Sequence, residues 1–190
     1  MKKVTLTLAT VLIFFGLGFA QDNNDKDEAS HAVVINIKSH ALVDVESEKG
    51  EAQFINLSPE APKEAGLGLD FSKATDNSLW LNYSSIVKQK QARTVSVSMK
   101  EELPKGVELY LAASKDVGEG KGKVGEASAE EQKLSANGVK LVSGIGSCYT
   151  GNGYKKGHNL KFSLKMDEDK YGELITEDYK VEVIYTITGN

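Results

Sequence analysis

One glycine-rich stretch holds the side chains best suited to covalent chemistry. SGIGSCYTGNGYKKGH runs from Ser143 to His158 and contains Cys148, the only cysteine of the chain. A thiol and an imidazole can form a nucleophile and its general base when the fold brings them together. The nucleophilic thiol also needs a lowered pKa, supplied by a helix N-terminus or a nearby cation, and this stretch is typical of a turn between strands. We therefore predict that Cys148 is buried or half-buried and packs as a small apolar residue.

The segment GSCY, from Gly146 to Tyr149, resembles the end of the signature around the nucleophile of papain-like proteases. That family has another cysteine three residues before the nucleophile, where this chain has Ile145. Neither a Ser-His-Asp grouping nor the G-x-S-x-G turn of serine hydrolases stands out. We expect that the protein is not an enzyme, and a hydrolase is the function that the sequence supports least.

The same stretch is better suited to binding a ligand. Its glycines allow tight chain reversals, and aromatic faces, an amide and cationic groups gather on it. The candidate ligand-binding residues are Tyr149, Asn152, Tyr154, Lys155, Lys156 and His158. The alternative is an exposed hairpin loop without a ligand, because polar loops of this composition are common.

No cofactor or metal is expected, with calcium as a weak alternative. DEDKYGELITED has acids at Asp167, Asp169 and Asp178, as a calcium loop would, but Tyr171 takes the place of one ligand. Both flanks alternate as strands, whereas the helical calcium motif needs helices there. We therefore predict a polar connection between strands. The G-x-G-x-x-G pattern of GKGKVG, residues 120–125, lacks the strand-turn-helix setting of a dinucleotide site.

Alternating apolar and polar residues dominate the rest of the chain and predict strands. Val33, Ile35 and Ile37 share one face of AVVINIKS, and the same phase continues through Ala41, Val43 and Val45, so we predict one strand with a bend near Ser39 and His40. Further runs of this kind are AQFINL, SLWLNYSS, RTVSVSM, GVELYLAAS, NLKFSLKM and YKVEVIYTIT. We predict an all-β fold, an antiparallel β-sandwich of immunoglobulin-like or jelly-roll type with seven to nine strands. Trp80 is the expected large anchor of its core.

The N-terminus has the organisation of a secretory signal peptide, which we assign to residues 1–20. Lys2 and Lys3 supply the positive start, and an almost uncharged apolar stretch ends in small residues at Ala20. Residues 21–30 are polar and acidic, and this composition predicts a disordered arm. We expect residues 31–190 to form a single β-sandwich domain.

These features predict an exported protein of the periplasm, cell surface or extracellular medium, without a transmembrane anchor in the mature chain. The formal net charge of −4 becomes about −6 once the two signal lysines are removed. Phosphate binding needs clustered lysine and arginine, and Arg93 is the only arginine. We therefore expect no nucleic-acid partner. A lone cysteine excludes an intramolecular disulfide, so stability must come from packing.

A resemblance to a group of known proteins spans most of the mature chain and is carried by four segments. They are WLNY at Trp80, LPKGVEL at Leu103, GIGSCYTGNG at Gly144 and VIYTIT at Val183. The chain resembles small exported β-sandwich proteins of Gram-negative bacteria, most of which have no assigned activity. A fainter likeness is to the WxL surface domains of Gram-positive bacteria, which bind the cell wall. LWLN and YTI stand in place of their Trp-x-Leu elements, so no wall-binding residue is carried over.

Two functions remain open for such a domain. The first is a non-catalytic module of the cell envelope or extracellular space, an adhesin or ligand binder whose partner is an unknown surface ligand. The alternative is a pilin-like fibre subunit that assembles by strand donation, with AVVINIKS completing the sheet of a neighbouring subunit.

Overall fold

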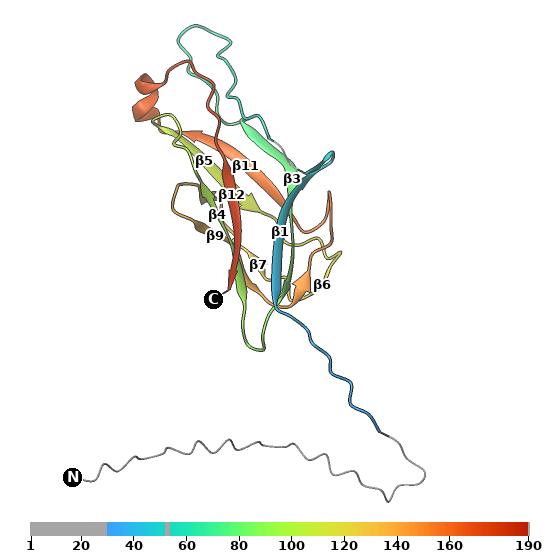
Figure 1. The fold of residues 1–190 in the computed structure, drawn as a ribbon. Coiled ribbons are helices and arrows are strands. Elements are labelled where there is room, and N and C mark those ends of the chain that lie inside the picture. Colours follow the sequence, from blue (N-terminus) through green and yellow to red (C-terminus); the bar gives the residue numbers. More distant parts are fainter. Residues whose placement is uncertain (1–29, 52–53, 190) are drawn as a thin grey trace, which may run out of the picture. The chain divides into compact units, whose positions relative to one another are not determined.

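The computed structural model describes residues 30–51 and 54–189. The predicted signal peptide and all but the last residue of the predicted acidic arm lie outside the described residues. The chain separates into two units, residues 1–36 and residues 37–190. In the first unit, the described residues 30–36 form no helix or strand. The second unit contains every strand of the described part (Figure 1).

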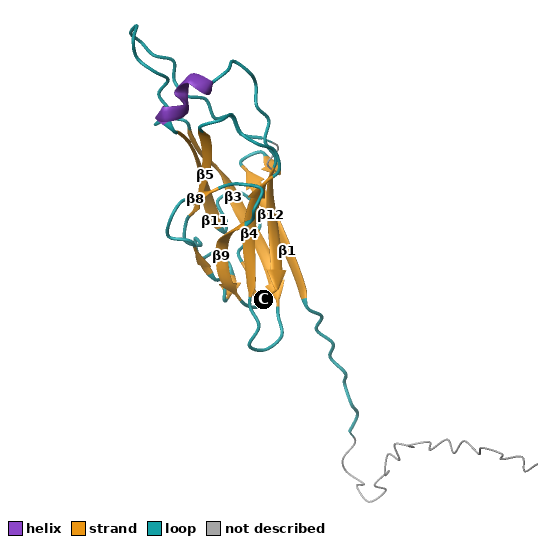
Figure 2. Cartoon of the chain, turned by 90° about the vertical axis from the view of Figure 1, so that its left-hand side faces the viewer, coloured by secondary structure: helices purple, strands orange, loops and turns teal. Residues whose placement is uncertain are grey.

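The described residues of the second unit form two antiparallel sheets, of eight and four strands (Figure 2). Across the larger sheet the order is β2 (Gly50–Glu51), β1 (His40–Ser47), β3 (Thr75–Ile86), β11 (His158–Met166), β5 (Val107–Ala113) and β8 (Gln132–Lys133). The two short strands β10 (Cys148–Tyr149) and β6 (Lys121–Gly122) extend it, because β10 pairs with both β3 and β6. The order of the smaller sheet is β12 (Val183–Gly189), β4 (Arg93–Met99), β9 (Val139–Ile145) and β7 (Glu126–Ala127).

Helix is almost absent from the described residues. One short 3₁₀ helix, η1 (Glu168–Glu173), lies in the connection between β11 and β12. No helix within residues 30–51 and 54–189 is long and apolar enough to cross a membrane. The prediction of an all-β, antiparallel sandwich-like fold is confirmed.

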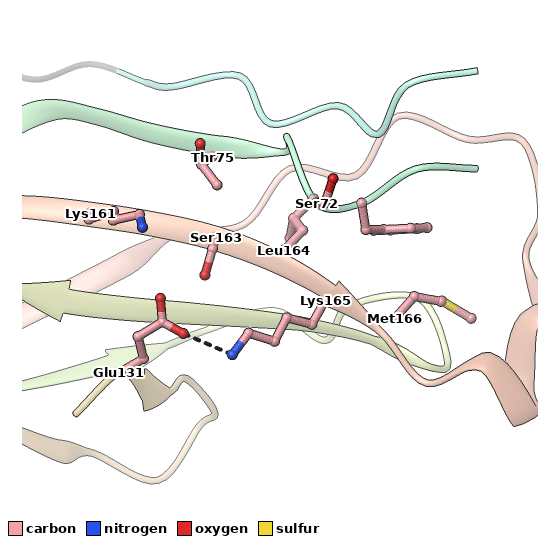
Figure 3. A pocket seen from close by; sticks show the side chains of 9 residues that line it. Ser72, Thr75, Glu131, Lys161, Ser163, Leu164, Lys165 and Met166 are labelled. Atoms are coloured by element: carbon pink, nitrogen blue, oxygen red, sulfur yellow. Dashed lines mark hydrogen bonds and ion pairs between the residues drawn. The ribbon is translucent and has the colours of Figure 1, made fainter. Parts of the chain in front are cut away.

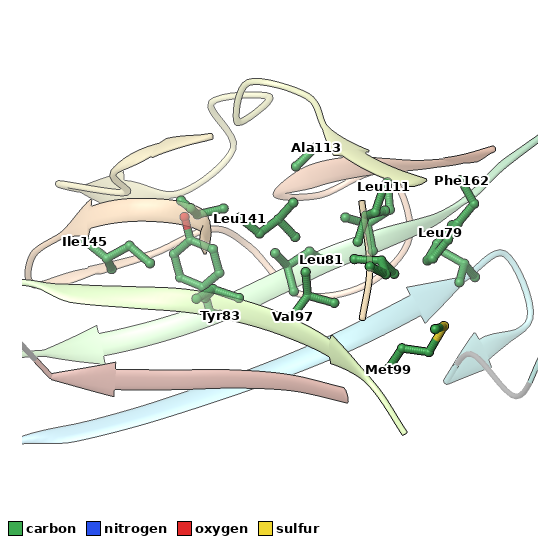
Figure 4. Packing of buried hydrophobic residues seen from close by; sticks show 14 of the residues in the cluster. Leu79, Leu81, Tyr83, Val97, Met99, Leu111, Ala113, Leu141, Ile145 and Phe162 are labelled. Atoms are coloured by element: carbon green, nitrogen blue, oxygen red, sulfur yellow. The ribbon is translucent and has the colours of Figure 1, made fainter. Parts of the chain in front are cut away.

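The core lies between the two sheets and follows the alternation of the strands (Figure 4). β3, β5 and β11 contribute leucines from the larger sheet, and β4 and β9 contribute aliphatic residues from the smaller one. The largest fully buried apolar side chains are Leu81, Leu111, Leu160, Leu141, Ile145, Val95, Val97 and Val142. Burial of each such side chain stabilises the fold by about 1.5–3 kcal/mol relative to exposure, which opposes the loss of conformational entropy on folding.

One predicted strand is confirmed only in its second half, and another is wrong. The alternation that starts at Val33 was expected to continue as a strand to Val45, but β1 begins only at His40, and AVVINIKS pairs with no described strand. The described end of AQFINL, residues 54–57, is also not a strand. Ile55 and Leu57 still pack against the core as partly buried side chains. Alternation was therefore a correct guide to burial there, but it did not guarantee a partner strand.

The sequence did not predict the five two-residue strands, β2, β6, β7, β8 and β10, or the longer strand β9. β9 covers Val139–Ile145, which overlaps the stretch expected to be a turn. Its register against β4 shifts between Arg93 and Val95 and again at Ser96. Such a β-bulge breaks the period of two, and the neighbours Leu141 and Val142 are consequently both buried.

Candidate functional site

The glycine-rich stretch connects three strands and is fastened to β3. After β10, Thr150 is fully buried, and its Oγ1 accepts a hydrogen bond from the amide of Tyr83 at 3.0 Å. The amide of Thr150 donates in return to the carbonyl of Tyr83 at 3.1 Å. At the other end Gly157 has φ +68°, and a Cβ there would lie 2.1 Å from the carbonyl oxygen of Leu81. Only glycine fits such an approach, so residues 150–157 are held against the sheet.

Trp80 does not lie in the core, which corrects the prediction of a core anchor. Successive residues of a strand point to opposite faces, and Leu79 and Leu81 occupy the inner face of β3. Trp80 between them therefore lies on the outer face, where it is half-buried. The ring of Tyr154 meets it edge-on, with centroids 6.4 Å apart and planes at 84°, an arrangement that aromatic pairs prefer.

The outer face of β3 continues from Trp80 through Asn82. Asn82 is only 4% exposed, and its Nδ2 donates to the carbonyl of Gly153 at 3.2 Å. Its Oδ1 has no hydrogen-bond partner among the described residues. Tyr149 on β10 is paired with Ser84 of β3, and directly paired residues of antiparallel strands share a face. Tyr149 therefore belongs to the same surface as Trp80, and it is 51% exposed.

We call this surface the Trp80 surface. It consists of Trp80, Asn82, Tyr149, Tyr154 and Lys155, and Asn152 belongs to the loop that carries Tyr154. Asn152 and Lys155 are exposed, and Lys155 Nζ lies 5.2 Å from the centroid of the Tyr154 ring, a cation–π contact. Lys156 lies at its margin, where Nζ pairs with the carboxylate of Glu119 at 2.9 Å.

His158 is the candidate residue that the structure places elsewhere. It is 1% exposed at the start of β11, stacked on Tyr83 with centroids 5.6 Å apart. Its Nδ1 lies 2.7 Å from the carbonyl oxygen of Ser114, and its Nε2 lies 2.7 Å from the hydroxyl of Tyr83. A ligand on the surface cannot touch this ring, so His158 holds the end of the loop in place instead of binding.

The hydrogen bonds around His158 depend on its charge. Nδ1 must carry a proton, because the carbonyl of Ser114 can only accept. The Tyr83 hydroxyl contacts both Nε2 and the carbonyl oxygen of Val124, but its single proton can serve only one of them. When His158 is neutral, Tyr83 donates to Nε2. When His158 is protonated, Nε2 donates to Tyr83, and Tyr83 donates to Val124.

Burial favours the neutral state of this histidine. It lowers the pKa of His158 below the usual 6.5, while the Ser114 carbonyl and the charge of Asp116 oppose the shift. Burial also raises the pKa of Tyr83, so its hydroxyl keeps its proton. The ring is therefore neutral near pH 7, with Tyr83 as its hydrogen-bond donor.

Cys148 is buried within the core cluster, as predicted from the sequence. Burial, with the nearby charge of Asp116, raises the pKa of its thiol to about 11. At neutral pH the thiolate that attacks electrophiles is therefore scarce. This is the environment of a structural cysteine.

The structure does not gather the weak calcium candidates into a metal site. No group of three or more histidine, cysteine or acidic side chains is arranged to hold a metal within residues 30–51 and 54–189. Asp167 precedes η1 and pairs with Lys170 at 3.2 Å, and Asp169 lies inside η1. Asp178 lies in the exposed coil that follows.

The sequence did not indicate a shallow pocket on the larger sheet, at the end of β3 and β11 away from Trp80 (Figure 3). Its volume is about 350 Å³, and it is lined by Phe71, Ser72, Thr75, Glu131, Lys161, Ser163, Leu164, Lys165 and Met166. Lys165 and Glu131 form an ion pair across it at 2.8 Å, which lowers the pKa of Glu131. The nearby hydroxyl of Ser163 also lowers the pKa of Glu131, by less than Lys165 does. The Oγ atom of Ser163 is buried and has no hydrogen-bond partner among the described residues. No motif signals the pocket, because three distant segments form it.

No protein-family model, curated protein sequence or solved structure matches the chain. The fold therefore defines the class by itself: an all-β domain of two antiparallel sheets.

Proposed function

We propose that this protein is an exported, non-catalytic module of the cell envelope or extracellular space that binds a ligand through the Trp80 surface. The observation that carries the proposal is the convergence of three aromatic side chains on one outer face of β3, although they come from two strands and a loop. Trp80 and Tyr154 are in ring contact, and Tyr149 lies on the same face.

The charges around this surface favour an uncharged polar ligand. Asp44 and Glu46 of β1 are paired with Asn82 and Trp80, so the acidic side chains lie on one flank. Lys155 lies on the loop flank. Aromatic faces with a few convergent amide and charged groups are typical of binding sites. A neutral, polyhydroxylated compound such as an envelope glycan fits this balance, because hydroxyl groups can pair with both flanks.

The test is binding of the mature chain to neutral polysaccharide purified from cell envelopes. Tyr149→Ala should weaken binding by about 1–2 kcal/mol, roughly a tenfold rise in the dissociation constant, because an aromatic contact is lost. The matched control is Tyr179→Ala, since Tyr179 is 40% exposed in the connection before β12. Equal binding by the wild type and both variants would refute this use of the Trp80 surface.

Export rests on the N-terminal sequence. The positive start, the apolar stretch and the small residues before Gln21 support cleavage at that point. The intact mass of the protein recovered from the periplasm or medium should lack residues 1–20. Recovery of an uncleaved chain from the cytoplasm would contradict the proposed location.

A second function, a fibre subunit that assembles by strand donation, is favoured by a separate observation. Residues 33–37, which we now call the arm, have no strand partner among the described residues. The apolar side chains of Val33, Ile35 and Ile37 in this arm are 71%, 79% and 76% exposed. Contiguous apolar side chains in water are uncommon on a monomer and mark interaction segments. The arm could therefore add to the sheet of another molecule.

A further inference from the structure

The exposed arm has the properties of a strand that lacks a sheet. Val33, Val34, Ile35 and Ile37 are all β-branched, and Val34 is 90% exposed. β-Branched residues favour strands, where they pack well on a pleated surface. On a strand, Val33, Ile35 and Ile37 would form an apolar face, with Val34 and Asn36 on the opposite face.

Most sheet edges in the described part are blunted. β2, β6, β7 and β8 have two residues each, and very short edge strands make poor templates for another chain. β8 pairs with the middle of β5, and β7 pairs with β9. β1 carries Asp44 and Glu46, and its end pairs with β2. Charges on edge strands also discourage pairing.

β12 is the exception among the described edges. It has seven residues, Val183–Gly189, paired with β4 over its whole length. Its other edge pairs with no described strand. The sequence VIYTITG contains neither a charged residue nor proline, so the usual protection of an edge is missing.

The core is also incompletely covered along this edge. Val183, Tyr185 and Ile187 face the core from β12 but remain only partly buried. Val43 and Val45 of β1 are partly buried in the same way, and β1 lies beside β12 (Figure 1). An added strand at the β12 edge would cover apolar surface that the chain itself leaves accessible.

We propose that residues 33–37 of one copy pair as a strand with the free edge of β12 in a second copy. Val33, Ile35 and Ile37 would then lie on the core side, next to the inward-facing residues of β12. The contact joins two different surfaces, so repetition produces an open chain of subunits unless a ring closes. This inference rests on the strand-donation function and names its acceptor.

The first experiment measures the mass of the mature protein by light scattering over a concentration series. Wild type should associate as concentration rises. Ile35→Lys should raise the dissociation constant more than about tenfold, because a charge would enter the core side. Val34→Lys is the matched control, since its side chain would point away from the core, and it should still associate. Circular dichroism should show both variants folded, because neither position lies in a strand of the domain.

The second experiment locates the acceptor. Asn36→Cys and Thr186→Cys, in separate copies, should cross-link when mixed, because both side chains would lie on the outer face of the extended sheet. Asn137→Cys, which is exposed outside any strand, should not cross-link with the arm. The native Cys148 is buried and should contribute little.

The outcomes separate the two claims. A wild type that is monomeric at every concentration would refute both strand donation and β12 as its acceptor. An equal loss of association in Ile35→Lys and Val34→Lys would refute both as well. Association that depends on Ile35 without a cross-link to Thr186→Cys preserves strand donation and overturns β12 as the acceptor.

Discussion

At the scale of single residues, the buried pair of Tyr83 and His158 connects the loop to the core. The histidine ring spans the distance from β3 to the carbonyl of Ser114. Burial of the pair disfavours the charged form of the imidazole in the folded state. The protonation state of His158 therefore influences the stability of the fold.

The burial of His158 predicts acid sensitivity. The pKa of His158 is lowered in the folded state, so below about 6.5 the unfolded chain takes up a proton that the folded chain resists. The stability that depends on neutral His158 is therefore present above pH 6.5 and lost as the pH falls. Urea unfolding at pH 7.5 and pH 5.5 should show this loss. His158→Phe should be about 1–3 kcal/mol less stable at pH 7.5 but should lose less on acidification. An equal loss in both proteins would contradict the account.

A pair of glycines tests the fastening of the same loop. Gly157→Ala should destabilise the protein by more than about 2 kcal/mol, because the added Cβ would lie 2.1 Å from the Leu81 carbonyl oxygen at φ +68°. Gly144→Ala, on β9, has a similar φ of +71° but open space around it, so only backbone strain of about 1 kcal/mol should appear. Thermal unfolding measures both. Equal destabilisation would show that the close approach to β3 is absent.

At the scale of elements, alternation identified strands well where one face packs on the core without interruption. RTVSVSM was predicted as a strand, and β4 covers the same residues. β9 was missed because a bulge breaks its period. The arm was predicted as a strand because its apolar and polar residues alternate. Alternation shows that a segment suits a strand, but whether another strand lies beside it depends on the rest of the fold.

The candidate site was partly predictable from the sequence. The glycines and aromatic residues indicated the loop, and the structure places Tyr149, Tyr154 and Lys155 on the Trp80 surface. Trp80 was expected in the core because its neighbours are leucines, although the period of two puts it on the opposite face. The burial of His158 depends on contacts with Ser114 and Tyr83, which are distant in sequence and carry no local signal.

The packing of the loop on β3 predicts a fluorescence change. Trp80 is the only tryptophan, and the Tyr154 ring shields it. Tyr154→Ala should expose the indole and shift its emission to longer wavelength. Tyr149→Ala should leave the emission maximum unchanged, because among the described residues the ring in contact with Trp80 is that of Tyr154. An unchanged maximum in Tyr154→Ala would show that the loop does not cover this part of the sheet.

At the scale of the whole molecule, the domain offers separate places for separate contacts. The Trp80 surface lies on the outer face of the larger sheet, whereas the unprotected edge belongs to β12 in the smaller sheet. The pocket around Ser163 involves the opposite end of β3 and β11. The ligand binding and the assembly that we propose therefore use different residues.

Ligand binding by the Trp80 surface can be tested by amide chemical-shift mapping of the mature chain during titration with neutral envelope polysaccharide. We expect perturbations centred on Trp80, Asn82 and residues 149–155, and we expect Tyr149→Ala to reduce them. Perturbations centred on the pocket around Ser163, or none at saturating polysaccharide, would contradict it.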